Sequence, residues 1–159
     1  MFRESEKDRV NKLNACLAKI LSGMKPPEDL TVSQWADKNR RLTSESSAEV
    51  GKWRTSRTPY MFDILDSFTD PLIEHIVVVA ASQVGKSETI NNMVGYCIDQ
   101  DPGPILLIQP TIDDVKRYSE MRIAPMIRET RCLKRKVADP KSRDAANTKR
   151  QKSFPGGVL

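Results

Sequence analysis

The sequence predicts an α/β fold, a parallel sheet with helices on both faces, from two apolar segments and the helical patterns that follow them. Residues 73–81 (IEHIVVVAA) are largely apolar and rich in β-branched residues, which is typical of a buried parallel strand. Residues 105–110 (ILLIQP) form a second apolar run. Because a helical pattern follows each run, the order is strand, helix, strand, helix, as in a βαβ unit.

A helical segment precedes this sheet. Residues 5–22 repeat apolar side chains at helical spacing, which predicts one apolar stripe made of Val10, Leu13, Leu17, Ile20 and Leu21. Gly23 and then Pro26-Pro27 end the helix and begin a linker. The stripe is suited to docking on a partner and equally to packing on the chain's own core. We therefore expect residues 1–30 to form a separate N-terminal unit.

Residues 31–72 are expected to form a second unit. A short helix is predicted over 31–39, with Thr31 or Ser33 as its cap, followed by a polar, irregular stretch. Another short helix is predicted over 60–68, with Pro59 at its start. The sheet and its helices then occupy the third unit, residues 73–159.

Within this third unit, the helix after the first strand should direct Ile90, Met93, Val94 and Cys97 to one face. A turn at 101–104 leads to the second strand, a helix follows over 112–122, and Pro125 should kink or restart it. The last residues, 148–159, are expected to form a strand, a Gly-Gly turn and the start of another strand.

Composition restricts the class of protein. The 159 residues have a mass of 18.0 kDa, enough for one domain with a single core. The longest apolar run, residues 76–81, is too short to span a membrane, and the charged N-terminus does not resemble a signal peptide. We therefore expect a cytoplasmic protein that does not associate with membranes. The three cysteines form no CxxC pair, which favours free, buried thiols, and a single histidine argues against His-rich metal sites.

Positive charge is concentrated at the C-terminal end. Residues 131–159 contain nine basic and two acidic residues, a net charge of +7, whereas the whole chain carries +5. Such a basic segment is expected of a protein that binds a polyanion, although an ordinary solvated surface explains it equally well. The candidate DNA-binding residues are Lys134, Arg135, Lys136, Arg143, Lys149 and Arg150.

The strongest functional motif lies between the first predicted strand and its helix. Gly85-Lys86-Ser87 ends the stretch AASQVGKS as the pattern G-x-x-x-x-G-K-[ST] requires, but Ala80 stands where that pattern has its first glycine. Alanine is unsuitable there only if the position needs a positive φ. The predicted nucleotide-binding residues of the loop are Ala80, Ala81, Ser82, Gln83, Val84, Gly85, Lys86 and Ser87.

The chemistry of the loop follows from its place before a helix. Unpaired N–H groups and the positive end of the helix dipole attract phosphate, and Gly85 allows its close approach. Lys86 would reach the β- and γ-phosphates of ATP as the catalytic cation, Ser87 would bind Mg²⁺, and Gln83 can also touch the γ-phosphate. Gly-Lys-Ser also arises by chance, but rarely between a clear strand and a clear helix. Hydrolysis further needs a strand that ends in an acid. The second strand runs into Gln109 instead, so we expect that acid to be absent from these residues.

Several segments closely resemble the lambda-type terminase large subunits, the GpA-like family. The resemblance runs in order from about residue 31 to 159 and is carried by WADKNRRLTSESSAEVGKWRTSRTPYMFDILD, VVVAASQVGKSETINNMVGYCID, DPGPILLIQPT, RIAPMIRET and KSRDAANTKRQKSFPGGVL. Trp53-Arg54-Thr55, Arg57-Thr58-Pro59-Tyr60 and KSFPGG are its most distinctive parts. It disfavours a fragment of some other P-loop helicase.

This resemblance implies an ATP-driven motor that packages viral double-stranded DNA into a procapsid, with a P-loop NTPase core of the RecA or helicase type. By the same resemblance, Arg57 and Tyr60 belong to the segment that contacts the adenine base of ATP in related motors and helicases. Tyr60 either stacks on that base or simply packs at a helix start. The segment ILLIQPT corresponds to one that couples the core to DNA. The family further implies a small terminase subunit as a partner of the N-terminal segment, contacts with the portal and procapsid, and a possible homo-oligomer.

The chain departs from this family in its length. Family members are several times longer and carry the acidic strand and a nuclease domain beyond FPGG, so we expect an N-terminal fragment with ATP turnover near background. The alternative is a truncated, non-catalytic module that binds nucleotide, DNA or the small subunit without turnover.

Overall fold

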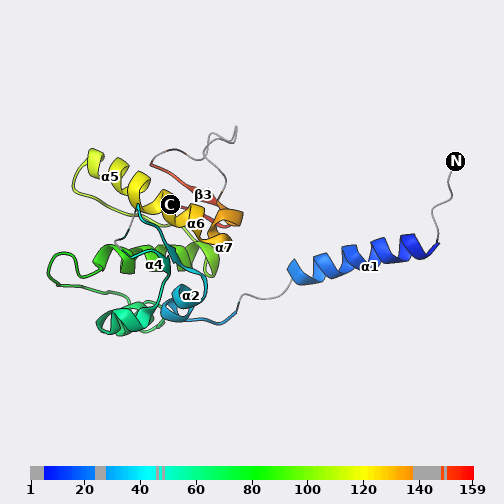
Figure 1. Cartoon of the computed structure of the whole chain (residues 1–159), viewed down its shortest axis with the longest axis horizontal. Helices are drawn as coiled ribbons and strands as arrows, with labels where there is room; N and C mark the ends of the chain where they lie inside the picture. The colour runs from blue at the N-terminus through cyan, green and yellow to red at the C-terminus, as the bar shows by residue number, and fades with distance from the viewer. Residues whose placement is uncertain (1–5, 24–27, 46, 48, 138–147, 149) are drawn as a thin grey trace.

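The computed structural model describes residues 6–23, 28–45, 47, 49–137, 148 and 150–159. Helix α1 (Glu6–Gly23) confirms the N-terminal helix and lies apart from the other helices (Figure 1). Its side chains Val10, Leu13, Leu17 and Ile20 are all exposed, so this stripe does not pack on the chain's own core. The predicted Pro26-Pro27 linker lies outside the described residues.

Within the described part of the chain, no helix combines the length and the hydropathy that a membrane span needs.

Helix α2 (Val32–Asn39) begins where its cap was predicted. The Thr31 hydroxyl accepts a bond from Gln34 N at 3.4 Å, and Gln34 Oε1 accepts one from Thr31 N at 3.2 Å, so the two residues form a capping box. The stretch that was expected to be irregular contains a short antiparallel pair, β1 (Arg41–Leu42) with β2 (Gly51–Lys52).

Short helical turns lead from this pair to the next segment. The 3₁₀ turns η1 (Thr55–Arg57) and η2 (Pro59–Met61) precede helix α3 (Phe62–Ser67). Pro59 stands at the first position of η2, so the predicted helix start after residue 58 is confirmed.

The core forms where α4 (Lys86–Asp99) packs against α2, α6 (Ala124–Glu129) and α7 (Arg131–Lys136) (Figure 1). Trp35 is fully buried, and its indole N–H donates to Asp99 Oδ2 at 2.8 Å. Gly95 faces this ring so closely that a Cβ there would lie 2.5 Å from Trp35 Cη2. The small glycine therefore allows α4 and α2 to pack directly against each other.

The helix predicted over 112–122 is found, and the helical segment continues beyond it to Glu129 in three parts. Helix α5 (Ile112–Tyr118) is continued by one π-helical turn, η3 (Ser119–Ile123), and then by α6, in which Pro125 stands in the first turn. The predicted restart at Pro125 is thus confirmed. Helix α7, which follows at once, was not predicted, because its basic sequence shows little apolar periodicity.

The chain closes in a hairpin, as expected. Strands β3 (Ser153–Phe154) and β4 (Gly157–Val158) are antiparallel, with Ser153 opposite Val158. Phe154 is buried in the core, and Ile105 N donates to Val158 O at 2.8 Å. The hairpin therefore lies beside the start of the second apolar segment.

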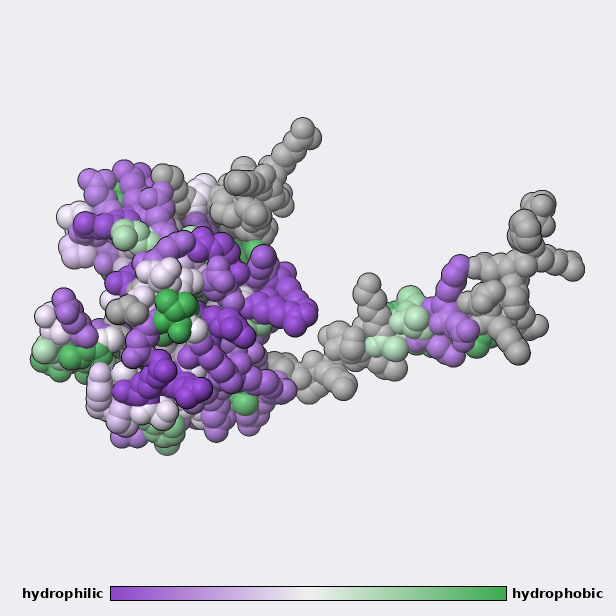
Figure 2. Space-filling view, viewed as in Figure 1, coloured by the Kyte–Doolittle hydropathy of each residue, from purple (hydrophilic) through white to green (hydrophobic). Residues whose placement is uncertain are grey.

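The two predicted parallel strands are the main error. Neither 73–81 nor 105–110 forms a strand, and no parallel sheet occurs among the described residues, whose sheets are the pairs β1–β2 and β3–β4. Val77 is 86% exposed and Val79 94% exposed, and Figure 2 shows hydrophobic surface at the edge where the chain leads into α4. A strand requires hydrogen bonds from a neighbouring backbone. Among the described residues, the backbone bonds of these two segments are a turn bond from Ile73 N to Asp70 O and the bond from Ile105 N to Val158 O. Apolar character alone therefore did not produce the sheet.

The expected apolar face of α4 is partly wrong for the same reason. Val94 is buried, but Ile90 is 42% exposed and Met93 is half-buried. Both residues face a hollow of about 490 Å³ that they share with Ile73, Ile76 and Val78. Because the first apolar segment does not close against the helix, this face remains open.

The cysteines are free, but their expected burial is only partly found. Cys16 is exposed, whereas Cys97 and Cys132 are half-buried. Burial raises the pKa of both Cys97 and Cys132 to about 11, so these two thiols stay protonated at neutral pH.

Candidate nucleotide-binding site

The loop before α4 leads into the helix through a residue with a left-handed backbone angle. Helix α4 begins at Lys86, directly after Gly85, whose φ of 91° lies in the left-handed region that favours glycine. Gln83 also has a positive φ, of 62°, whereas Ala80 does not. The alanine in place of the first glycine of the motif is therefore accommodated without strain, and the unusual backbone angle falls on Gln83 instead.

The first turn of α4 presents backbone donors to this loop. The first intrahelical bond runs from Thr89 N to Gly85 O at 3.0 Å, so the amides of Lys86, Ser87 and Glu88 precede it. Such amides and the positive end of a helix dipole attract an anion. The side chain of Thr89 also caps Gly85 O, at 3.3 Å.

The Lys86 ammonium lies across the loop. It donates to Ala80 O at 2.8 Å and to Ala81 O. The side chain therefore folds back from the start of α4 to the first residues of the loop. Ser87 follows on the first turn and is half-buried.

Tyr60 is brought to the loop, but Arg57 is held elsewhere. The Tyr60 hydroxyl donates to Val84 O at 3.2 Å, and its ring lines an apolar hollow of about 380 Å³ that includes Val78, Val79 and Ala80. Arg57 forms a surface ion pair with Glu49. The predicted adenine side thus contains the tyrosine, while the arginine is engaged by an acid of its own segment.

A second set of residues near the loop was not predicted from the sequence. Glu88 directly follows Ser87 and is only 8% exposed. Its Oε2 accepts a bond from Arg40 Nη2 at 2.7 Å, and its Oε1 lies 3.3 Å from Arg122 Nη1. Arg40 is 1% exposed; burial lowers its pKa from the ordinary value, although the Glu88 carboxylate opposes this shift. The only signal in the sequence was an acid next to the motif, and its partners lie 48 and 34 residues away.

Tyr118 extends this set to helix α5. Its hydroxyl lies 2.8 Å from Asn91 Oδ1 and 3.3 Å from Ser87 O, and Asn91 Nδ2 donates to Glu88 Oε1 at 3.2 Å. Burial and then the Glu88 carboxylate raise the pKa of Tyr118 to about 12. The first turn of α4 is therefore bonded both to α5, through Tyr118, and to Arg40, which directly follows α2.

The basic residues predicted to bind DNA differ in their surroundings. Lys134 and Arg135 are exposed on α7 and Arg150 is exposed before β3, but Lys136 forms an ion pair with Asp99 Oδ1 at 3.0 Å. Arg143 and Lys149 lie outside the described residues. Lys136 thus has a structural role in the core helix pair.

No cluster of three or more His, Cys, Asp or Glu side chains suited to hold a metal ion occurs in the described part of the chain. Ser87 remains the residue predicted to hold Mg²⁺, through a hydroxyl that would share the ion with nucleotide phosphates.

Comparison with known proteins identifies the class. The terminase large subunit of Escherichia phage lambda is 28% identical over 121 residues, which are 76% of this chain and 19% of that protein. The terminase large subunit of Enterobacteria phage P21 is 27% identical over 132 residues, which are 83% of this chain and 20% of that protein. No solved structure matches.

A family model places the chain within this class. The model for phage terminase large subunit gpA, ATPase domain, matches residues 47–159. The chain belongs to this family, as the resemblance predicted. It spans about a fifth of the length of the two relatives.

Proposed function

We propose that this chain supplies the ATP-binding loop of a phage terminase large subunit that packages double-stranded DNA. The observation that carries the proposal is the loop of residues 80–87, where α4 begins directly at Lys86 after a left-handed Gly85. The amides of the first turn would hold the phosphates of ATP, and Lys86 would exchange its bonds to Ala80 and Ala81 for phosphate oxygens. Membership of a family defined by an ATPase domain supports this assignment.

The neighbouring residues would complete the site. Ser87 would hold Mg²⁺, which neutralises phosphate charge when bound. The Tyr60 ring lies beside the loop at Val84, and its hollow is of a size that accepts a purine base. We therefore propose Tyr60, rather than Arg57, as the residue of this segment that meets the nucleotide.

The partners proposed for the protein follow from exposed surfaces and from the family. The apolar stripe of α1 is suited to docking on the small terminase subunit, because Val10, Leu13, Leu17 and Ile20 are exposed together. Lys134, Arg135 and Arg150 are available for DNA phosphates. Portal and procapsid contacts are proposed from the relatives' activity alone, and the protein would act in the host cytoplasm.

The loop is tested by removing its cation. We expect Lys86→Ala to weaken binding of a fluorescent ATP analogue in the presence of Mg²⁺ by at least about tenfold, since a charge-assisted bond contributes about 1.5–3 kcal/mol. Lys116→Ala is the matched control, because Lys116 is a half-exposed lysine paired with Asp113 at 3.1 Å and lies away from residues 80–87 in the sequence. Equal affinity of the two variants would show that the loop does not bind nucleotide.

A further inference from the structure

Two arginines from separate parts of the chain meet at the residue after the GKS motif. Arg40 follows α2 and Arg122 belongs to η3, and both contact the carboxylate of Glu88, at 2.7 and 3.3 Å. Arg40 is fully buried, whereas the side chain of Arg122 is 39% exposed. Glu88 is thus bonded on both of its oxygens, by residues that are distant in sequence.

This contact limits how the first turn of α4 can move. Successive residues on an α-helix are separated by a rotation of about 100°. When Glu88 is held between Arg40 and Arg122, the directions in which the Ser87 and Lys86 side chains leave the helix are set with it. Since phosphate binding depends on where those two side chains point, the Glu88 contacts determine the geometry of the loop.

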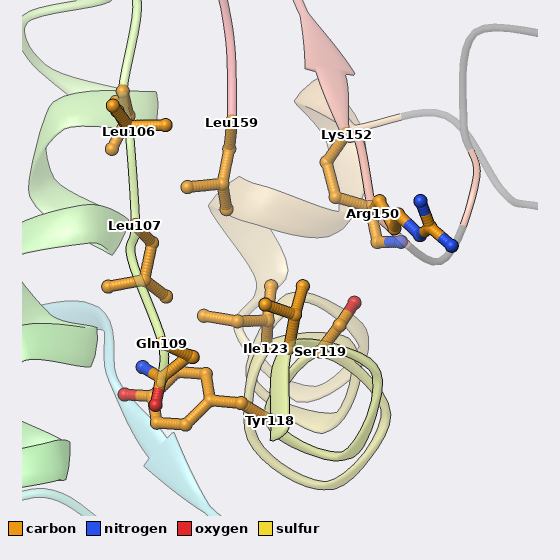
Figure 3. Close-up of a pocket in the computed structure, with 11 residues that line it drawn as sticks. Leu106, Leu107, Gln109, Tyr118, Ser119, Ile123, Arg150, Lys152 and Leu159 are labelled. Carbon is orange, nitrogen blue, oxygen red and sulfur yellow. The ribbon is translucent and has the colours of Figure 1, made fainter. Parts of the chain in front are cut away.

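The same contacts reach the segment that follows the second apolar run. The Tyr118 hydroxyl contacts the first turn of α4 through Ser87 O and Asn91 Oδ1. Figure 3 shows the ring of Tyr118 beside the side chain of Gln109, at the end of residues 105–109. Arg122, which contacts Glu88, lies in the π-helical turn η3 that directly continues α5 after Tyr118. Such π-turns are frequent at functional sites.

Arg122 also lines a hollow beside Ser87. Together with Ser87, Gln109, Arg117 and Tyr118 it lines a hollow of about 360 Å³. Of the two arginines that contact Glu88, Arg40 is buried and closer, whereas Arg122 is more distant and more accessible to solvent.

We propose that Glu88 and Arg122 are positioning residues for phosphate binding, which set the first turn of α4 and connect it to α5. Arg40 anchors Glu88 in the core, and Arg122 transmits the position of η3 to Lys86 and Ser87. This proposal rests on the proposed function, because it describes how the same loop is oriented.

The test uses Arg122, whose half-exposed side chain can be changed without leaving a buried charge alone. We expect Arg122→Gln to weaken binding of the Mg²⁺–ATP analogue about three- to tenfold and binding of AMP by less than about twofold, because only the longer phosphate chain reaches Lys86 and Ser87. Arg122→Lys should restore most of the affinity, since it keeps the charge. Arg128→Gln is the control, because Arg128 is similarly exposed but pairs with Glu45 and Glu129.

Thermal melting separates positioning from folding. All three variants should melt within about 3 °C of the unchanged chain, since exposed pairs contribute about 0–1 kcal/mol. Arg122→Gln that binds the ATP analogue as tightly as Arg128→Gln would overturn the positioning role while leaving the loop intact. An equal loss of ATP and AMP affinity would also overturn it. If the unchanged chain binds no nucleotide, the function and the positioning role both fail.

Discussion

The buried pair of Arg40 and Glu88 provides the sharpest test of how this chain is held together. Glu88→Leu would leave the Arg40 guanidinium in the core, 1% exposed, with its 2.7 Å partner removed. Removing one member of a buried ion pair costs about 3–5 kcal/mol, because the remaining charge is neither solvated nor paired. An exposed pair such as Lys116 with Asp113 contributes about 0–1 kcal/mol by comparison.

The other changes in the cycle have smaller expected effects. Arg40→Met leaves Glu88 in contact with Arg122 and Asn91, so we expect a loss of about 1–3 kcal/mol. The double variant Arg40→Met/Glu88→Leu leaves no buried charge, and its stability should lie within about 1–2 kcal/mol of the unchanged chain. The two changes are therefore expected to be far from additive.

Urea denaturation followed by far-ultraviolet circular dichroism measures each free energy of unfolding. For a chain of this length, the Glu88→Leu loss corresponds to a fall in Tm of roughly 6–20 °C. Two results would contradict this prediction: a Glu88→Leu chain as stable as Lys116→Ala, or a double variant as unstable as the sum of the single losses. Either would show that the pair does not determine stability.

Two further predictions concern acid and salt. Burial raises the pKa of Asp99, but hydrogen bonds from Trp35 and Lys136 outweigh this effect and hold the pKa below its ordinary value. The Asp99 carboxylate therefore stabilises the fold above about pH 4, and this stabilisation is lost as the pH falls through the pKa of Asp99 in the folded chain. The stability deficit of Asp99→Asn should therefore shrink between pH 5 and 2 in thermal melts, whereas a constant deficit would contradict this. Binding of double-stranded DNA should weaken steeply with salt, and Lys134→Ala/Arg135→Ala should reduce the slope of log K against log salt by about two units if both contact phosphate. An unchanged slope would exclude α7 from the DNA contact.

Local signals predicted most of the helices. Thr31 caps α2 with its own side chain, Pro59 and Pro125 stand at helix starts, and Gly85 turns the chain into α4. Each of these signals acts within three or four residues, through a backbone angle or a single hydrogen bond, so the sequence states it directly. The closing hairpin was predictable in the same way, although its turn is Pro155-Gly156 and Gly157 already belongs to β4.

The predicted sheet failed because strands depend on neighbours rather than on their own residues. The segments 73–81 and 105–110 have the composition of buried strands, yet their hydrogen-bonding partners must come from elsewhere. Helix α7 was missed for a related reason. Its Leu133 is fully buried against the core, but the surrounding basic residues hide any apolar period.

Contiguous residues were enough to predict the loop of residues 80–87 and the helix that begins at Lys86, because both depend on local signals and on the left-handed angle of Gly85. The meeting of Arg40 and Arg122 at Glu88, and the contact of Tyr60 with Val84, could be found only from the folded chain. Those contacts join residues 24 to 48 positions apart, and their energies depend on burial, which no local pattern records.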